Sequence, residues 1–223
     1  MADDLSRRVV LVTGASGIAA AGARLFAELG ASVFIVSRTE EKCVRLAEEI
    51  TDSGGSCGWA RADLTIEVQS TDAVRSCREQ FGRIDGLFAV AGGSGRRLGD
   101  GPLHEMSLSG WEGTFELNGH PAFLAARDVI RVMLDQNPDE SGSRGSIVLV
   151  SSVLAEHPAP GYFATHAYAA VKGVEIALTK TLAAYYAKDG IRINTIASGL
   201  VETPMARRAA DDPEIVAYAA RKQ

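Results

Sequence analysis

A tyrosine and a lysine stand four residues apart in Tyr168-Ala-Ala-Val-Lys172, within a stretch whose pattern predicts a helix. Positions i and i+4 share one helix face, so we expect the phenol and the ammonium to point the same way. A free tyrosine has a pKa of about 10 and is a poor base at neutral pH, but a fixed cation favours the phenolate and lowers that value. Tyr168 is therefore predicted to exchange a proton with a substrate oxygen.

Two serines, Ser151 and Ser152, follow the apolar run Ser146–Val150. If that run is a strand of a parallel sheet, the serines lie at its carboxyl end, where such sheets bind ligands. One of the two hydroxyls is then placed to hold the same substrate oxygen. A Tyr-x-x-x-Lys pair is also common on helix surfaces without any function. Here the glycine-rich segment described next favours the catalytic interpretation of the pair.

The segment Thr13-Gly14-Ala15-Ser16-Gly17-Ile18-Ala19 separates a β-branched run from an alanine-rich one. Glycines there let the backbone approach a pyrophosphate, and the following helix presents free N–H groups to it. A plain strand-to-helix turn is the alternative for the motif alone. The segment is the first turn in a chain whose predicted strands and helices alternate, and this position favours its interpretation as a nucleotide-binding loop.

Two further positions bear on the choice of cofactor. The second strand ends in Val36-Ser37-Arg38, where NAD-binding folds usually carry an acid; an arginine there can accept a 2′-phosphate, which predicts NADP and leaves NAD open. A solvated arginine, or one stacked on adenine, is the alternative. Asp63, in Arg61-Ala-Asp-Leu64, is expected either to accept from an adenine amino group or to cap the helix that begins near Glu67.

Strand-like and helix-like segments alternate along the chain. The predicted strands are 9–12, 32–36, 57–62, 84–90, 146–150 and 191–197, and the predicted helices are 20–29, 40–50, 67–81, 111–134 and 166–187. This alternation predicts an α/β fold, a Rossmann-type doubly wound parallel sheet in a three-layer αβα arrangement. We expect residues 1–223 to form a single domain.

Composition excludes several classes of protein. The chain is 46% hydrophobic and 23% charged, with a net charge of -5, which is typical of a soluble globular protein. A nucleic-acid partner is not expected from that charge, and no stretch approaches the roughly 20 apolar residues of a membrane span. The three cysteines form no CxxC, so we expect no metal site and a reduced, cytoplasmic chain.

From Val9 to Met205 the chain resembles a classical short-chain dehydrogenase/reductase. The matching motifs are the loop 13–18, Asp63-Leu64, Ala91-Gly92, Asn118, Ser152, Tyr168 with Lys172, and Gly199-Leu-Val-Glu-Thr203. The resemblance implies NAD(P)-dependent oxidation of a small alcohol or reduction of a carbonyl. Tyr168 would be the acid/base, Lys172 would bind the nicotinamide ribose and lower the tyrosine pKa, and Ser152 would orient the substrate oxygen.

The resemblance also implies roles away from the Tyr–Lys pair. Asn118 would hold a water that links Lys172 to solvent. The implied cofactor contacts are Gly14, Ser16, Gly17, Ile18, Ser37, Arg38, Asp63, Leu64, Ala91, Gly92, Tyr168, Lys172, Val201 and Thr203. The helices that begin near Trp111 and His166 would pair with their copies, which predicts a homodimer or homotetramer.

The chain departs from the family's pattern in three places. The glycine loop is one residue short and ends in Ala19, and Ala89-Val-Ala-Gly92 stands where the family has Asn-Asn-Ala-Gly, losing a side chain that ties the central strand. We also expect the family's seventh strand to be missing from residues 1–223, either because a natural C-terminal segment lies beyond Gln223 or because the protein lacks it. Two other functions stay open: a dinucleotide-binding sensor without turnover, and a different chemistry, such as dehalogenation or epimerisation, on the same fold.

Overall fold

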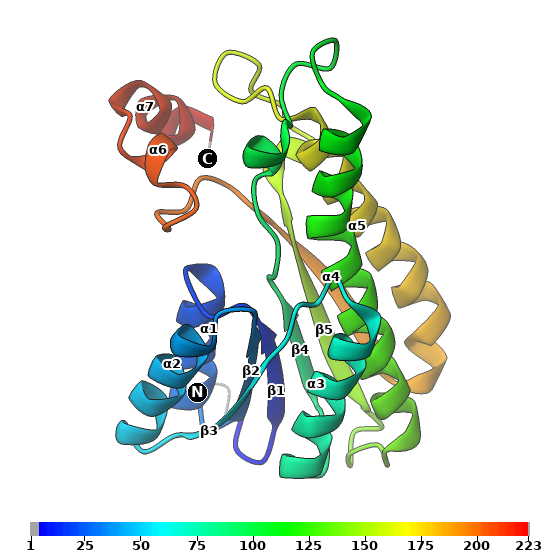
Figure 1. The fold of residues 1–223 in the computed structure, drawn as a ribbon. Coiled ribbons are helices and arrows are strands. Elements are labelled where there is room, and N and C mark those ends of the chain that lie inside the picture. Colours follow the sequence, from blue (N-terminus) through cyan, green and yellow to red (C-terminus); the bar gives the residue numbers. More distant parts are fainter. Residues whose placement is uncertain (1–4, 223) are drawn as a thin grey trace.

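The computed structural model describes residues 5–222 and contains one six-stranded parallel sheet with helices on both faces (Figure 1). The strands are β1 (Val9–Thr13), β2 (Ser32–Ser37), β3 (Ser56–Arg61), β4 (Gly86–Ala89), β5 (Gly145–Ser152) and β6 (Ile191–Ser198). Their order is β3-β2-β1-β4-β5-β6, and every neighbouring pair is parallel. This is the doubly wound order of the Rossmann fold, so the predicted fold class is confirmed.

Seven α-helices are found among residues 5–222. They are α1 (Ile18–Glu28), α2 (Glu40–Asp52), α3 (Glu67–Phe81), α4 (Leu108–Asp135), α5 (His166–Tyr186), α6 (Arg207–Ala210) and α7 (Pro213–Lys222). Short 3-10 turns cover η1 (Gly95–Leu98), η2 (Val153–Ala155) and η3 (Ala187–Asp189). The five predicted helices correspond to α1–α5, whereas α6 and α7 were not predicted from the sequence.

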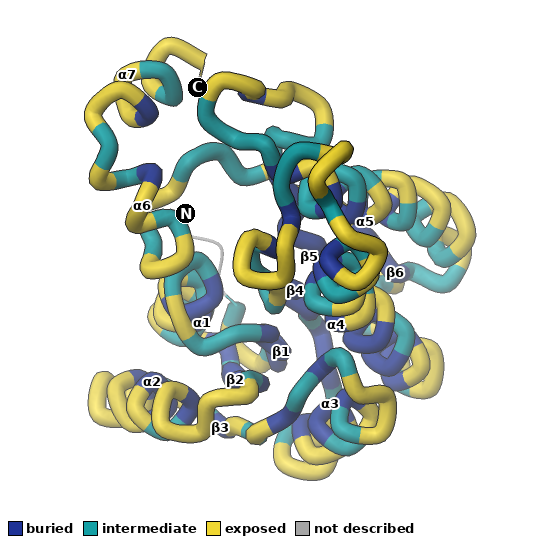
Figure 2. The backbone as a smooth tube through the Cα atoms, turned by 45° about the horizontal axis from the view of Figure 1, so that its top comes forward, coloured by how far each residue is buried: buried dark blue, intermediate teal, exposed yellow. Residues whose placement is uncertain are grey.

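The two faces of β1 explain why its sequence is apolar without alternation. Val9 and Leu11 join one core with residues of α3 and α4, and Val10 and Val12 join a second core with residues of α1 and α2. A strand covered on both faces buries every side chain, and all five residues of β1 are buried. Figure 2 shows the same pattern, with buried backbone in the strands and exposed backbone on the outer sides of the helices.

The main boundary differences have local causes. β4 is shorter than the predicted strand 84–90, because the N–H of Ile84 donates to Gln136 and the N–H of Val90 donates to the hydroxyl of Thr13. α4 begins at Leu108, before the predicted start at residue 111, because the hydroxyl of Ser107 accepts from the N–H of Gly110 and caps the helix there.

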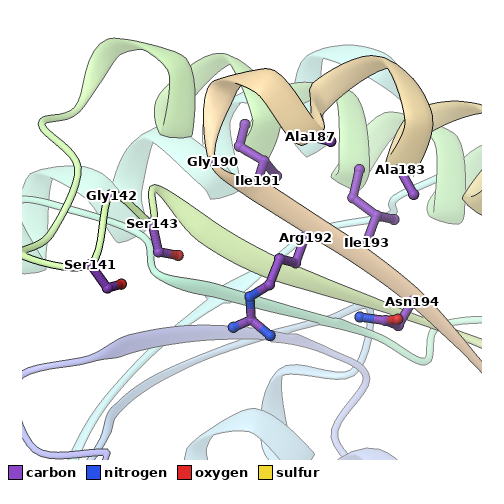
Figure 3. Close-up of a pocket in the computed structure, with 10 residues that line it drawn as sticks. All are labelled: Ser141, Gly142, Ser143, Ala183, Ala187, Gly190, Ile191, Arg192, Ile193 and Asn194. Carbon is purple, nitrogen blue, oxygen red and sulfur yellow. The ribbon is translucent and has the colours of Figure 1, made fainter.

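Within residues 5–222 the sheet ends at β3 on one side and at β6 on the other. A pocket follows the amino-terminal half of β6, and Figure 3 shows it open along that strand. Its lining comes from residues 141–143, Ala183, Ala187 and residues 190–194. These residues lie at the amino-terminal ends of β5 and β6, away from the carboxyl ends where the predicted site residues lie.

Candidate active site

The carboxyl ends of β1, β4 and β5 meet at one edge of the sheet, because all three strands are parallel. The chain order reverses between β1 and β4, and a crevice at such a reversal is where doubly wound sheets bind ligands. The glycine loop follows β1, the Ala91-Gly92 turn follows β4, and Ser152 ends β5. The fold therefore brings the three predicted parts of the site together.

The glycine loop adopts a backbone that needs glycine. Gly14 has a φ of 106° and Gly17 a φ of 56°, both in the left-handed region. A Cβ on Gly17 would lie 3.1 Å from Cγ2 of Thr203, so that residue, distant in sequence, lies beside the loop. A Cβ on Gly14 would lie 3.0 Å from the Cβ of Ala19, which takes the place of the family's last glycine and is buried beside it.

The end of β1 is tied to the turn after β4 by one hydroxyl. The Oγ1 of Thr13 accepts hydrogen bonds from the N–H of Val90, at 2.9 Å, and from that of Ala91, at 3.0 Å. The sequence predicted a structural loss where the family's asparagine is replaced by Val90. In this structure the hydroxyl of Thr13 connects β1 to the end of β4, and it does so through the backbone N–H of Val90.

Asn118 uses its side chain to hold the loop after β4. Its Oδ1 accepts from the N–H of Gly93 at 3.0 Å, and its Nδ2 donates to the carbonyls of Gly93, at 3.0 Å, and Thr114, at 2.9 Å. Pro121 lies three residues further along α4 and has no N–H, so the carbonyl of Leu117 loses its helical partner. The side chain of Asn118 is thus engaged, and the backbone carbonyl at Leu117 is the group here that is available to a water.

At the carboxyl end of β2, Arg38 leans toward Asp63. Its Nη1 lies 3.8 Å from Oδ2 of Asp63, and the arginine side chain is 61% exposed. Oδ1 of Asp63 accepts from the N–H of Thr65 at 3.0 Å and from its hydroxyl at 2.9 Å. Ile66, and not Asp63, precedes α3, so the helix-cap alternative for Asp63 is wrong; its carboxylate closes the turn before the helix.

The other predicted contacts differ in how much of each residue faces the crevice. Ser16 is exposed at the tip of the glycine loop, and Ser37 ends β2 with its hydroxyl accepting from the N–H of Thr39 at 3.4 Å. Leu64 is buried in the core beside α3, so only its backbone is available to a ligand. Val201 is 41% exposed in the segment that leads to Thr203.

The two serines at the end of β5 have different partners. The hydroxyl of Ser151 donates to the backbone carbonyl of Lys172 at 2.7 Å and ties α5 to the strand. The hydroxyl of Ser152 accepts from the N–H of Leu154 at 3.2 Å and lies close enough to the phenol of Tyr168 to lower its pKa. Of the pair, Ser152 is therefore the serine that faces Tyr168.

The ammonium of Lys172 is buried and fully hydrogen-bonded. Its Nζ lies 5.8 Å from the ring centroid of Tyr168, as the helical spacing predicted. It donates to the carbonyl of Val150 at 2.9 Å and lies 2.8 and 3.0 Å from the two carboxylate oxygens of Glu175. Sequence reasoning missed Glu175, although an acid three residues after a lysine on one helix is a signal for such a pair.

The environment of Tyr168 raises its pKa. Burial is the largest cause, the hydroxyl of Ser152 lowers the pKa, and the charge of Glu175 raises it again. The sequence predicted a lowered pKa for Tyr168, and the pKa is instead raised, because burial disfavours the phenolate and the charge of Glu175 adds to that effect.

A second residue that the sequence did not reveal holds the start of α5. The carboxylate of Asp100, which is 6% exposed, accepts from the N–H of Ala167 and from the N–H of Tyr168, both at 3.0 Å. The residue before the helix, Thr165, makes no side-chain cap. Asp100 therefore caps the helix that carries Tyr168, from a loop far away in sequence.

Residues 5–222 contain no group of three or more His, Cys, Asp or Glu side chains placed to hold a metal ion. None of their helices is both long and apolar enough to cross a membrane.

Comparisons with known proteins agree with this geometry. A family model described as short chain dehydrogenase matches residues 8–214. Cis-4-hydroxycyclohexanecarboxylate dehydrogenase of Sinomonas cyclohexanicum is 34% identical over 206 residues, covering 92% of this chain and 78% of that protein. Glucose 1-dehydrogenase of Gluconobacter oxydans is 36% identical over 214 residues, covering 95% and 76%. The crystal structure of levodione reductase superposes with a TM-score of 0.83 at 31% identity, covering 97% and 81%.

Proposed function

Because this chain belongs to the short-chain dehydrogenase family, we propose that it transfers a hydride between a nicotinamide cofactor and a small alcohol or carbonyl compound, with Tyr168 as the general acid and base. One observation carries the proposal. The phenol of Tyr168 lies beside the hydroxyl of Ser152, and the ammonium of Lys172 lies 5.8 Å from its ring centroid, at the sheet edge that also carries the glycine loop. We propose that residues 1–223 act as one cofactor-binding domain.

The residues present fit a dinucleotide. The left-handed glycines leave room beside Thr203 that a side chain would fill, and the first turn of α1 offers its N–H groups to a pyrophosphate. The pyrophosphate would be held by Gly14, Ser16, Gly17 and Ile18, the adenosine by Ser37, Arg38, Asp63 and Leu64, and the nicotinamide half by Ala91, Gly92, Tyr168, Lys172, Val201 and Thr203. When bound, the nicotinamide accepts or donates the hydride.

The chain's own residues handle the proton. In alcohol oxidation, the hydroxyl of Ser152 holds the substrate oxygen and the phenolate oxygen of Tyr168 removes its proton; in carbonyl reduction the neutral phenol returns one. Lys172 supplies the positive charge beside the phenol. Asn118 keeps the loop after β4 in place, and the carbonyl of Leu117, freed by Pro121, is the candidate to hold the water that the resemblance assigned to Asn118.

Arg38 supports NADP as the preferred cofactor. Its guanidinium is exposed at the end of β2, and a 2′-phosphate there would gain a charge-assisted, two-point contact. NAD remains the alternative, because Asp63 lies beside the arginine and its Oδ2, which faces Arg38, can also accept from ribose hydroxyls.

Two arginines support a substrate that carries an acid group. Arg96, in η1, and Arg208, in α6, follow the turns that hold Gly92 and Thr203, and neither forms an ion pair within residues 5–222. Burial lowers the pKa of Arg96, and the charge of Arg208 lowers it further while that of Asp100 raises it, so both groups act on Arg96 through their charges. We propose a hydroxy or keto acid as substrate, in keeping with the hydroxycyclohexanecarboxylate named for one relative.

The test is a panel of alcohols and ketones, with and without a carboxylate, followed by the absorbance of the reduced nicotinamide. Tyr168→Phe is expected to lose about 10²- to 10⁴-fold in rate, the usual contribution of a general acid, and to bind the cofactor normally. Tyr185→Phe, on the exposed side of the same helix, is the matched control and keeps its activity. Normal turnover by Tyr168→Phe would remove that residue from the mechanism. Cofactor binding without turnover of any compound would favour the sensor alternative.

A further inference from the structure

One face of α5 carries a line of polar side chains into the interior. Tyr168, Lys172, Glu175 and Thr179 occupy positions i, i+4, i+7 and i+11, which share one side of a helix. Apart from Tyr168, all of them are buried, and the carboxylate of Glu175 is only 3% exposed. A charge taken out of water in this way is costly unless it is paired. The buried carboxylate of Glu175 is therefore tolerated inside the protein because it has a partner of opposite charge.

That partner is the ammonium of Lys172, and the pairing uses all of its donors. An ammonium has three N–H groups. The three acceptors around Nζ are the two oxygens of Glu175, at 2.8 and 3.0 Å, and the carbonyl of Val150, at 2.9 Å. Lys172 is thus held in place by an acid on its own helix and by a carbonyl at the end of β5. Its positive charge is balanced at the same point.

The groups around the phenol of Tyr168 come from several elements. From β5, the hydroxyl of Ser152 lies beside the phenol and lowers the tyrosine pKa. From the loop after η1, the carboxylate of Asp100 binds the backbone N–H of Tyr168. From α4, the close approach to α5 is at Gly119 and Val171, where no charge lies. Lys172 and Glu175 are the charged pair on α5 itself, and Glu175 acts on the phenol through its charge.

We infer that Glu175 is a positioning residue: it neutralises and fixes the ammonium of Lys172, and so keeps Tyr168 as a neutral phenol, ready to act as an acid, in the resting protein. The inference rests on the proposed function for its catalytic meaning, but the protonation of Tyr168 can be measured without any reaction. This protonation state has a consequence for the reaction. Carbonyl reduction begins from the neutral phenol, so it should proceed at lower pH than alcohol oxidation, which begins from the phenolate.

Glu175→Gln tests the inference because it keeps the shape and removes the charge. An unbalanced ammonium near the phenol, 5.8 Å from its ring centre, favours the phenolate. The titration midpoint of Tyr168 is expected to fall by about one pH unit or more, the size of effect that an opposite charge at such a distance produces. In alcohol oxidation, where the phenolate is the active form, the rising limb of the pH–rate profile should move down by the same amount.

The titration is followed by the ultraviolet difference absorbance of tyrosinate in the cofactor-free protein. Wild type and Glu175→Gln are each compared with the same protein carrying Tyr168→Phe, so that the difference isolates one phenol. Thr179→Val removes a buried polar group from the same helix face without a charge, and Glu48→Gln removes an exposed acid from α2. Both control variants are expected to leave the midpoint of Tyr168 unchanged.

The outcomes separate this inference from the proposed function. A lowered midpoint in Glu175→Gln supports the inference even if no alcohol in the panel is oxidised. An unchanged midpoint in the folded variant overturns it even if the enzyme is active. Should Glu175→Gln fail to fold, Glu175→Met, which fills a similar volume without a charge or a polar group, is titrated in its place: a lowered Tyr168 midpoint supports the inference, and an unchanged one overturns it.

Discussion

The sharpest test of how the fold positions Tyr168 is the removal of the carboxylate of Asp100. The first N–H groups of any helix lack partners within the helix. In α5 two of them, on Ala167 and Tyr168, donate to the two oxygens of Asp100 at 3.0 Å. Since Thr165 makes no cap of its own, Asp100→Ala leaves both donors without their acceptor.

The expected loss of stability follows from those two bonds. A hydrogen bond to a charged group contributes about 1.5–3 kcal/mol, and loss of a helix N-cap costs about 0.5–2 kcal/mol. Asp100 is buried, so water replaces the lost bonds poorly, and Asp100→Ala should lower the free energy of unfolding by about 2–4 kcal/mol. Asp100→Asn keeps one acceptor oxygen and loses the charge, so it should lose about half as much.

Equilibrium denaturation in urea measures both variants, with Asp72→Ala as the control. Asp72 is a half-exposed acid paired with Arg75 on the surface of α3, and removing such a pair costs about 0–1 kcal/mol. The rate should also fall about tenfold in Asp100→Ala, because an effect of about 1.4 kcal/mol on the placement of Tyr168 changes a rate by that factor. If Asp100→Ala unfolds at the same urea concentration as Asp72→Ala, the carboxylate does not cap α5 and the reasoning fails.

Three other changes should have direct readouts. Arg38→Asp is expected to abolish any preference for NADP over NAD in cofactor titrations, because it replaces the phosphate partner by a ribose acceptor; a wild type that already prefers NAD would contradict it. Lys172→Met should weaken cofactor binding, measured by fluorescence, and reduce the rate, and unchanged values of both would contradict the pairing with Tyr168. The protein should have at least a dimeric mass in light scattering, and Phe123→Asp, on the exposed side of α4, should reduce that mass; a monomeric wild type at micromolar concentration would exclude the assembly.

The fold could be predicted because its signals are local and repeated. Each buried strand is a short apolar run, and each of the helices α1–α5 shows its period over three turns or more. The two helices that were not predicted, α6 and α7, lack these signals. α6 has only four residues, and α7 has ten residues and is not followed by a further strand within residues 5–222, so neither takes part in the alternation of strands and helices from which the other helices were predicted.

The site could be predicted only where its residues form a motif. Gly17 with Thr203, and Tyr168 with Ser152, are brought together as the motifs implied. Asp100 was beyond reach because a single acid in a polar loop carries no sign of the helix that it caps from 67 residues away. The spacing of Glu175 from Lys172 could have predicted their ion pair. The direction in which Glu175 shifts the pKa of Tyr168 depends on burial, which a single sequence does not give.

The strand order has a further consequence for how the chain folds as it is synthesised. β1 lies inside the sheet. During synthesis it can pair with β2 as soon as that strand is made, but its other edge stays unpaired until β4 is made, whose first paired residue is Gly86. At about 5–20 residues per second, a ribosome needs roughly 4–15 s to make the intervening segment. During that interval the fully buried strand of the finished protein has one edge unpaired and open to another nascent chain. The same reversal that creates the crevice therefore leaves the unfinished chain with an unpaired strand edge until β4 has been made.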